Sequence, residues 1–263
     1  MVDIRGVAMD WDVRAHGPLD AAHTVLLLSG GFSTAEFYAE VAAEPSLGEI
    51  RLIAATLPGH GGSQPPEDPS LVACAHDAAK LAAAHGCDMV VGHSIGANVA
   101  LEMAAGEGFT GPIILLAPSF SLPDEMLALR VLDLLAVVLG PLPYAAAVSL
   151  ADVALTVAQL SPQRRNVLGT EVRKNSPRQL RRLVHAYLDY LRRHGSVASR
   201  LCDTGVPAWV VHAEQGDGGL TAAERRTLDA CPTTTVVTVP GTSWFLPNEK
   251  PGLVADLILG ALR

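Results

Sequence analysis

Ser94 lies in a pattern that limits the folds open to this chain, because a buried strand must pass into a helix through a very tight turn. Residues 92–96 read Gly-His-Ser-Ile-Gly, follow the apolar run 89–91 and precede a helix-like stretch, 97–105. The form G-x-S-x-G between a strand and a helix is typical of a nucleophile elbow, in which the serine hydroxyl stands clear of the sheet edge. The sequence therefore predicts Ser94 as a nucleophile. The alternative is a glycine-rich turn in which the serine is incidental.

Short apolar runs alternate with helix-like segments along most of the chain. The strand-like runs are 25–28, 51–55, 89–91, 113–116, 209–211 and 235–239. Segments such as 71–85 and 222–231 between them have the spacing of amphipathic helices. Continuous apolar strands alternating with helices predict an α/β fold with a mostly parallel sheet that is covered on both faces. Residues 7–13 alternate apolar and polar side chains, which favours an antiparallel edge strand.

One interval, about 121–201, breaks this alternation. It contains no strand signal, only helix-like stretches separated by proline-containing breaks at 140–143, 161–162 and 176–177. We expect it to form a helical cap over the carboxyl ends of the strands, where ligands bind in open α/β sheets. The chain is then one domain, 1–263, with the cap inserted into it.

Composition and charge restrict the partners. The 263 residues are 49% hydrophobic, which is ample for a large core, and carry a net charge of −8. That charge argues against nucleic acid or an anionic membrane as a partner, because either requires a basic face. Basic residues gather between 164 and 193. We interpret them as a solvated helix face, with a weak attraction for an acidic substrate or carrier domain as the alternative.

The cysteines and the apolar stretches bear on location. Cys74, Cys87, Cys202 and Cys231 are far apart and form no C-x-x-C pair, so they indicate neither a zinc site nor a disulfide framework and suit a reducing cytoplasm. The first residues lack the order of a signal peptide. The longest apolar stretches, 131–139 and 144–160, are too short or too interrupted by charges to span a bilayer. We therefore expect a cytoplasmic protein without a membrane partner.

Two backbone segments are candidates for an oxyanion hole. The amide of Ile95 opens the helix after Ser94, where free N–H groups and the helix dipole favour negative charge. The second donor is expected from the loop after an early strand, residues 29–32, which read Ser-Gly-Gly-Phe. We favour the amide of Phe32, with Gly31 as the alternative.

Three motifs together resemble the α/β-hydrolase superfamily, in its compact capped branch, across essentially the whole chain. Residues 57–63, Leu-Pro-Gly-His-Gly-Gly-Ser, resemble the family's loop after the fourth strand, and 92–96 resemble its elbow. Residues 210–217, Val-Val-His-Ala-Glu-Gln-Gly-Asp, resemble the segment that carries the acid of a catalytic triad. The resemblance implies Asp217 for that acid. Glu214 is the nearest alternative and Asp124 a distant third.

The family's catalytic histidine has no counterpart. The resemblance implies a histidine in a segment like Pro-Gly-x-Gly-His, and 240–244 read Pro-Gly-Thr-Ser-Trp. Trp244 occupies the histidine position, and no histidine follows His212. Indole has one N–H donor and no basic nitrogen, so it cannot take the proton from Ser94. Among the other histidines, His60, His93 and His212 are expected to be structural, whereas His185, on a cap helix, is a candidate for the pocket.

The expected activity is that of a hydrolase or acyltransferase that acts on a small hydrophobic ester or thioester through Ser94. The base would come from elsewhere, from His185 or from Asp217 through water. Two alternatives remain open: a lyase or cyclase using the same pocket, and a pseudoenzyme that binds an apolar ligand or a protein partner. No metal site or organic cofactor is implied, because the sequence has no ligand cluster and no phosphate loop.

Overall fold

The sheet has seven strands in the part of the chain that the structure, a computed structural model, describes, namely residues 11–215 and 219–263. Their order across the sheet is β1-β3-β2-β4-β5-β6-β7. The strands are β1 Val13–His16, β2 Thr24–Leu28, β3 Arg51–Ala55, β4 Met89–His93, β5 Ile113–Leu116, β6 Ala208–Ala213 and β7 Thr234–Val239. Only β1 runs antiparallel to its neighbour, and the other pairs are parallel. The predicted α/β class with a mostly parallel sheet is confirmed. Most of the expected edge strand 7–13 lies outside the described residues.

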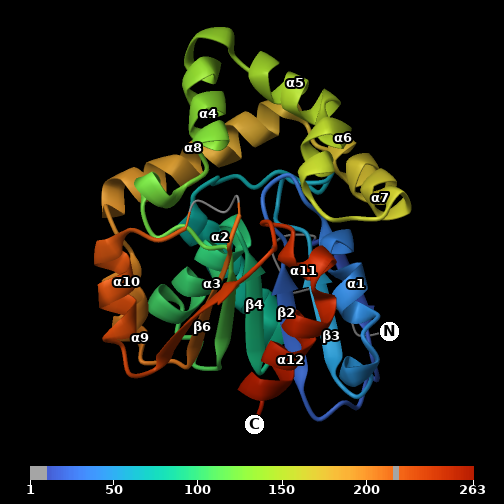
Figure 1. The fold of residues 1–263 in the computed structure, drawn as a ribbon, viewed down its shortest axis with the longest axis vertical. Coiled ribbons are helices and arrows are strands. Elements are labelled where there is room, and N and C mark those ends of the chain that lie inside the picture. The colour runs from blue at the N-terminus through green and yellow to red at the C-terminus, as the bar shows by residue number, and fades with distance from the viewer. Residues whose placement is uncertain (1–10, 216–218) are drawn as a thin grey trace.

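Helices cover both faces of the sheet, which is why its central strands are continuously apolar (Figure 1). Successive side chains of β2 point to opposite faces. Leu26 and Leu28 belong to a core that includes α2 (Leu71–His85) and α3 (Ile95–Gly106), whereas Val25 and Leu27 belong to a core that includes α1 (Ala39–Ala42) and α12 (Pro251–Ala261). The helices outside the β5–β6 interval are η1 Ala35–Tyr38, α1 Ala39–Ala42, η2 Pro45–Leu47, α2 Leu71–His85, α3 Ile95–Gly106, α10 Ala222–Asp229, α11 Leu246–Glu249 and α12 Pro251–Ala261.

The interval between β5 and β6 is helical wherever it has regular structure. It contains η3 Leu122–Asp124, α4 Leu127–Leu139, α5 Leu142–Ser149, α6 Ala151–Ala154, η4 Leu155–Val157, α7 Pro162–Arg173, α8 Pro177–His194 and α9 Ala198–Thr204. Figure 1 shows α4 to α8 as a separate layer above one end of the sheet. An isolated antiparallel bridge between Ser121 and Ser196 joins the two ends of this layer. The layer is therefore anchored where the chain leaves the sheet and where it returns.

A disulfide joins Cys202, on α9, to Cys231, shortly before β7. Their Cα atoms are 5.6 Å apart. The expectation that the cysteines form no disulfide was wrong, because packing of α9 against α10 brings together two residues that are distant in sequence. Cys74 and Cys87 remain free thiols. In the described ranges, no helix combines the length and the apolar character needed to cross a bilayer.

Candidate active site

Ser94 occupies the turn between β4 and α3 in a conformation that L-residues rarely adopt. Its φ and ψ angles are 51° and −121°. Its amide donates to the Leu116 carbonyl at 2.8 Å, and its carbonyl accepts the Ala97 amide at 2.8 Å. A non-glycine residue in such a region costs about 1–3 kcal/mol and persists only where its surroundings hold it. Here the neighbouring strand β5 and the first turn of α3 hold it.

The two glycines of the motif explain why this turn can be so tight. A Cβ at Gly92 would overlap the backbone of Gly96, on the other side of the turn. A Cβ at Gly96 would overlap the carbonyl oxygens of Leu28 and Ser29 at the end of β2. The absence of both side chains therefore brings the start of α3 against β2.

The loop after β2 lies directly beside this turn. A Cβ at Gly30 would lie 3.2 Å from the Ser94 Cβ, and a Cβ at Gly31 would lie 2.8 Å from the Ile95 Cδ1. Phe32 has a positive φ of 63°, and the Asn175 side chain donates to its carbonyl at 2.9 Å. Asn175, in the connection between α7 and α8, thus fixes the strained end of the loop next to Ser94.

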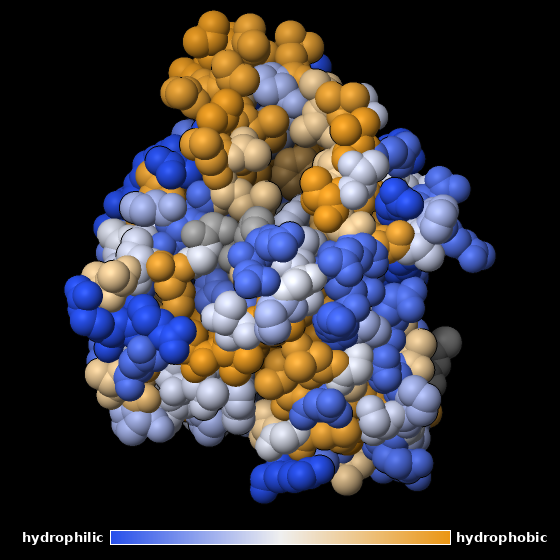
Figure 2. Space-filling model, in the orientation of Figure 1, coloured by the Kyte–Doolittle hydropathy of each residue, from blue (hydrophilic) through white to orange (hydrophobic). Residues whose placement is uncertain are grey.

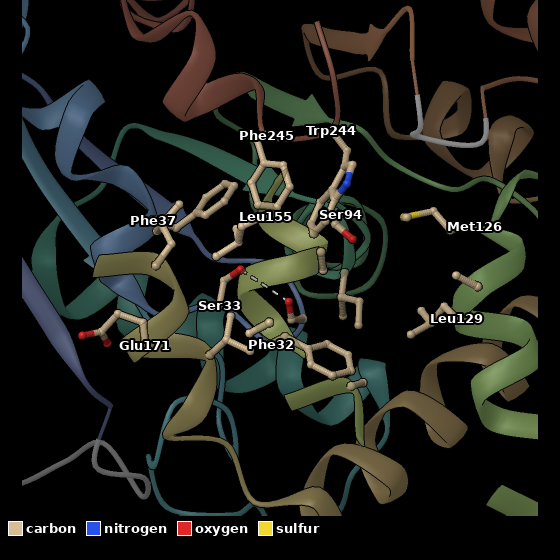
Figure 3. A pocket seen from close by; sticks show the side chains of 18 of the residues that line it. Phe32, Ser33, Phe37, Ser94, Met126, Leu129, Leu155, Glu171, Trp244 and Phe245 are labelled. Carbon is tan, nitrogen blue, oxygen red and sulfur yellow. Dashed lines mark hydrogen bonds between the residues drawn. The ribbon is translucent and has the colours of Figure 1, made fainter. Parts of the chain in front are cut away.

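Ser94 opens into a cavity of about 240 Å³ between the sheet and the α4–α8 layer. Gly31, Phe32, Ile95 and Trp244 also line it. Figure 3 shows Phe37 and Phe245 on one side of this cavity and Met126 and Leu129 on the other. The remaining lining residues are Ser33, Thr34, Glu125, Ala128, Leu132, Ala147, Ala151, Ala154, Leu155, Leu168, Glu171 and Val172. The cavity is therefore mostly apolar, and its polar lining residues are Ser33, Thr34, Ser94, Glu125 and Glu171, of which Ser94 lies at the strained turn.

Trp244 is held at the cavity by its backbone and by its ring. The Nε2 atom of His93 lies 2.6 Å from the Trp244 carbonyl oxygen, and the two rings stack with centroids 6.1 Å apart. The Phe245 ring lies 3.9 Å from the indole, between centroids. Next to it, Glu249 accepts from the amide and the hydroxyl of Ser243. The segment after β7 therefore places two aromatic rings, those of Trp244 and Phe245, on the cavity wall.

The sequence comparison decides the family. A model described as "Alpha/beta hydrolase family" matches residues 25–257. The chain belongs to the alpha/beta hydrolase family. The resemblance inferred from the three motifs is thereby confirmed, and the elements that carry Ser94, Ile95 and Phe32 all lie within the matched range.

Solved structures share the hydrolase fold at low sequence identity. A thermophilic esterase from Thermogutta terrifontis superimposes with a TM-score of 0.75 at 18% identity, covering 97% of this chain and 93% of that one. A hydrolase from Oleispira antarctica gives 0.74 at 16% identity, covering 97% and 96%. MenH from S. aureus gives 0.73 at 16% identity, covering 95% and 97%. None of the curated proteins matches the chain in sequence. These likenesses concern the fold alone.

The three acids expected from the family pattern lie in different surroundings. Asp217 lies outside the described residues. Glu214 accepts the Gly241 amide at 2.7 Å in an exposed position. Asp124 is buried and accepts the amides of Phe120 and Ser121, both at 3.1 Å. Asp124 does not line the described cavity around Ser94, and its contacts give it a role in holding the backbone after β5.

His185 lies away from Ser94. Its Nδ1 atom is 3.1 Å from the Asp133 carboxylate, and its side chain is 60% exposed. It lines a separate surface groove with arginines of α8, and it is not among the described residues that line the Ser94 cavity. His60 is buried, and burial lowers its pKa to about 4, so its imidazole is neutral at pH 7.

Glu125 is a buried carboxylate of the cavity that the sequence did not reveal. It accepts hydrogen bonds from Tyr187 at 2.7 Å, from Ser119 at 3.0 Å and from the Met126 amide at 2.8 Å. Burial raises its pKa, and these hydrogen bonds act against that rise. Because its oxygens are engaged, Glu125 fixes the start of α4 at the cavity wall. In the sequence, Glu125 is distinguished only by following Asp124 directly.

Proposed function

We propose that this alpha/beta hydrolase is a hydrolase or acyltransferase for a small hydrophobic ester or thioester, and that the acyl group is carried on Ser94 Oγ. The observation that supports this most directly is the strained serine of a G-x-S-x-G turn at the wall of an apolar cavity. A cavity used only for binding has no physical need for such strain. The α4–α8 layer serves as the cap, and its apolar side chains select an apolar acyl group.

In the proposed acyl transfer, two backbone amides donate hydrogen bonds to the negatively charged oxygen that forms on the substrate carbonyl. Ile95 is the first residue of α3, so its amide has no partner within the helix and lies at the positive end of the helix dipole. Phe32 provides the second amide, with Gly31 as the alternative. Ile95 and Phe32 line the same cavity as Ser94. The loop that carries Phe32 packs against the Ile95 side chain at Gly31. Such preorganised donors stabilise the charge that develops on the substrate carbonyl.

The proton of Ser94 has no imidazole acceptor among the described lining residues. Trp244 takes the place of that base and contributes an N–H donor and an apolar surface. Loss of the histidine in a catalytic triad costs several orders of magnitude in rate. We therefore propose slow acyl transfer, with Asp217 as the carboxylate that acts through water.

A second function is favoured by one specific observation, the aromatic wall that Trp244 and Phe245 form where a base is expected. In that case the protein binds an apolar ligand without turnover. The two functions differ in whether a covalent bond forms at Ser94. A lyase or cyclase would share the cavity and would also leave Ser94 unmodified.

The experiment that tests the proposal measures covalent labelling of Ser94 by intact-mass spectrometry, using an alkyl fluorophosphonate and p-nitrophenyl butyrate. We expect slow formation of one adduct, which Ser94→Ala abolishes. Ser33→Ala is the matched control, because Ser33 lines the same cavity on the neighbouring loop. Labelling that persists in Ser94→Ala, or its complete absence in the wild-type chain, would contradict an acyl-Ser94 intermediate. Rapid labelling would instead show that another residue supplies a strong base.

A further inference from the structure

Helix α4 exposes most of its apolar side chains, although it belongs to a chain with a large buried core. Its buried residues are only Asp133 and Ala136. The exposed ones are Leu127, Val131, Leu134, Leu135, Val137, Val138 and Leu139. Figure 2 shows the resulting apolar surface at the top of the molecule, over α4 and α5. Exposed apolar patches of this kind mark interaction sites on proteins, since burial of an amphipathic face normally supplies most of a helix's stability.

Four of these residues repeat with the spacing of a helix-pairing seam. Leu127, Val131, Leu134 and Val138 are separated by four, three and four residues. Their exposed fractions are 69%, 43%, 68% and 85%. At 100° per residue they form one narrow stripe along α4. The order, with valines seven residues apart and leucines seven residues apart, is the combination that favours two parallel helices in a coiled coil.

The charged residues of α4 leave this stripe uncharged. Asp133 is buried and pairs with His185 at 3.1 Å and with Arg192 at 3.2 Å. Arg130 is half-buried and lies to one side of the stripe at helical spacing. Leu129 and Leu132 lie on the opposite side of the helix and line the Ser94 cavity. The stripe therefore faces outward, directly behind the cavity wall.

The extent of the apolar face fits a protein interface. The segment that follows α4 also exposes aliphatic side chains, namely Leu142 on α5, Leu150 between α5 and α6, Val153 on α6 and Val157 on η4. Each of these exposed aliphatic side chains presents on the order of 50 Å² of apolar surface, which makes roughly 500 Å² for the whole face. A standard interface buries about 800 Å² on each partner, and polar rim residues account for a large part of it.

We propose that α4 pairs in parallel with α4 of a second copy of this chain, along the seam Leu127, Val131, Leu134 and Val138. A two-fold axis beside α4 places each seam residue next to its own counterpart. A lipid surface is a poorer partner, because helices that bind membrane surfaces combine leucine with tryptophan or phenylalanine and with several lysines or arginines, whereas α4 has no tryptophan or phenylalanine and one basic residue, Arg130. Pairing also braces the helix whose inner side forms the cavity wall. This proposal does not depend on the chemistry at Ser94.

The first test is the oligomeric state of the full chain by sedimentation velocity over a range of concentrations. We expect a dimer with a dissociation constant of about 1 μM or tighter. Leu134→Glu should weaken it by about a hundredfold, because two carboxylates then face each other across the axis. Val72→Glu is the control, since Val72 is 49% exposed on α2, away from the seam. A wild-type chain that stays monomeric, or a Leu134→Glu variant that dimerises like wild type, overturns the proposal.

The second test checks the parallel register. Val138→Cys should form an intermolecular disulfide on mild oxidation, whereas Val72→Cys should not. A dimer in which Val138→Cys does not cross-link overturns the parallel arrangement. Binding of monomeric wild-type chain to phosphatidylcholine vesicles would also overturn the proposal, and would assign the face to a lipid surface.

Discussion

The imidazole of His93 lies against Trp244, with its Nε2 atom 2.6 Å from the Trp244 carbonyl oxygen. This contact joins the serine turn to the segment after β7, across 151 residues of sequence. It fixes the backbone of position 244 and leaves the side chain at the cavity that Ser94 lines. A different side chain at position 244 therefore projects from a backbone that is already in place.

Trp244→His is the most direct test of whether the base has been lost from an otherwise complete site. A histidine has a basic nitrogen that indole lacks, so we expect hydrolysis of short p-nitrophenyl esters to rise by about a hundredfold or more. The steady-state rate of p-nitrophenol release measures this. The double variant Ser94→Ala/Trp244→His must lose the gain. No gain in the single variant would indicate a pocket rebuilt for binding or for other chemistry.

Gly96→Ala should be severely destabilising. Its Cβ would overlap the backbone carbonyls of Leu28 and Ser29, which cannot move without displacing β2. We expect a loss of about 3 kcal/mol or more in the free energy of unfolding, measured by urea denaturation. Gly106→Ala, at the end of the same helix, is the control. The new Cβ meets only the end of the Arg200 side chain and the Glu102 carboxylate, at ordinary van der Waals distances. We expect the free energy of unfolding of this variant to be unchanged or to rise by up to about 1 kcal/mol. Equal stability of Gly96→Ala and wild type would contradict the close packing of the turn.

The sheet was predictable because its central strands are buried on both faces. Such strands need apolar side chains at every position, and a continuous apolar run such as 113–116 is visible without alignment. The turn at Ser94 was predictable for a related reason, since only glycine fits at positions 92 and 96. In both cases one local requirement determines the residue type.

Other features depend on tertiary packing that no local pattern encodes. The Cys202–Cys231 disulfide joins residues 29 apart and exists because α9 packs against α10. The burial of Glu125 follows from Tyr187 on α8, which lies 62 residues further along the chain. His185 was a reasonable candidate on sequence, but the polar side of α8 carries it toward Asp133. The contacts of Glu125 and His185 are set by how the α4–α8 layer folds, and the disulfide is set by how α9 packs against α10.

Arg164 on α7 should be important for holding that layer to the sheet. It is buried and donates to Asn248 Oδ1 at 2.8 Å, and to the carboxylate and carbonyl of Glu36 at 2.7 and 2.6 Å. Arg164→Ala removes the donor to Asn248 Oδ1 and to the Glu36 carbonyl, and leaves Arg14 as the remaining partner of the Glu36 carboxylate, so we expect a loss of about 3 kcal/mol in the free energy of unfolding. Arg173→Ala on the same helix is the control. Arg173 pairs with Asp152 at the exposed surface, where such a bridge contributes less than about 1 kcal/mol. Similar losses for the two variants would refute the special role of Arg164.

Asp124 should make the stability of the fold depend on pH. Burial, together with a hydrogen bond to Glu224 and its negative charge, raises the pKa of Asp124 to about 7. In Glu224, burial acts to raise the pKa, but hydrogen bonds with Thr221, Asp124 and Ser121 lower it overall. The folded chain thus keeps a proton on Asp124 that the unfolded chain releases near pH 4. The stabilisation from that proton is complete below about pH 4 and is lost as the pH rises through about 7.

Asp124→Asn should therefore flatten the fall in stability between pH 5 and pH 8. The asparagine amide can donate to Glu224 at every pH, whereas the ionised aspartate repels it. We expect wild type to lose on the order of 2 kcal/mol across this range through Asp124. Glu224 does not contribute to that fall, because a lowered carboxyl pKa acts only at more acidic pH. Urea denaturation at both pH values measures the difference, with Asp229→Asn on the exposed side of α10 as the control. If Asp124→Asn and wild type lose the same stability between pH 5 and pH 8, the Asp124–Glu224 pair does not share a proton.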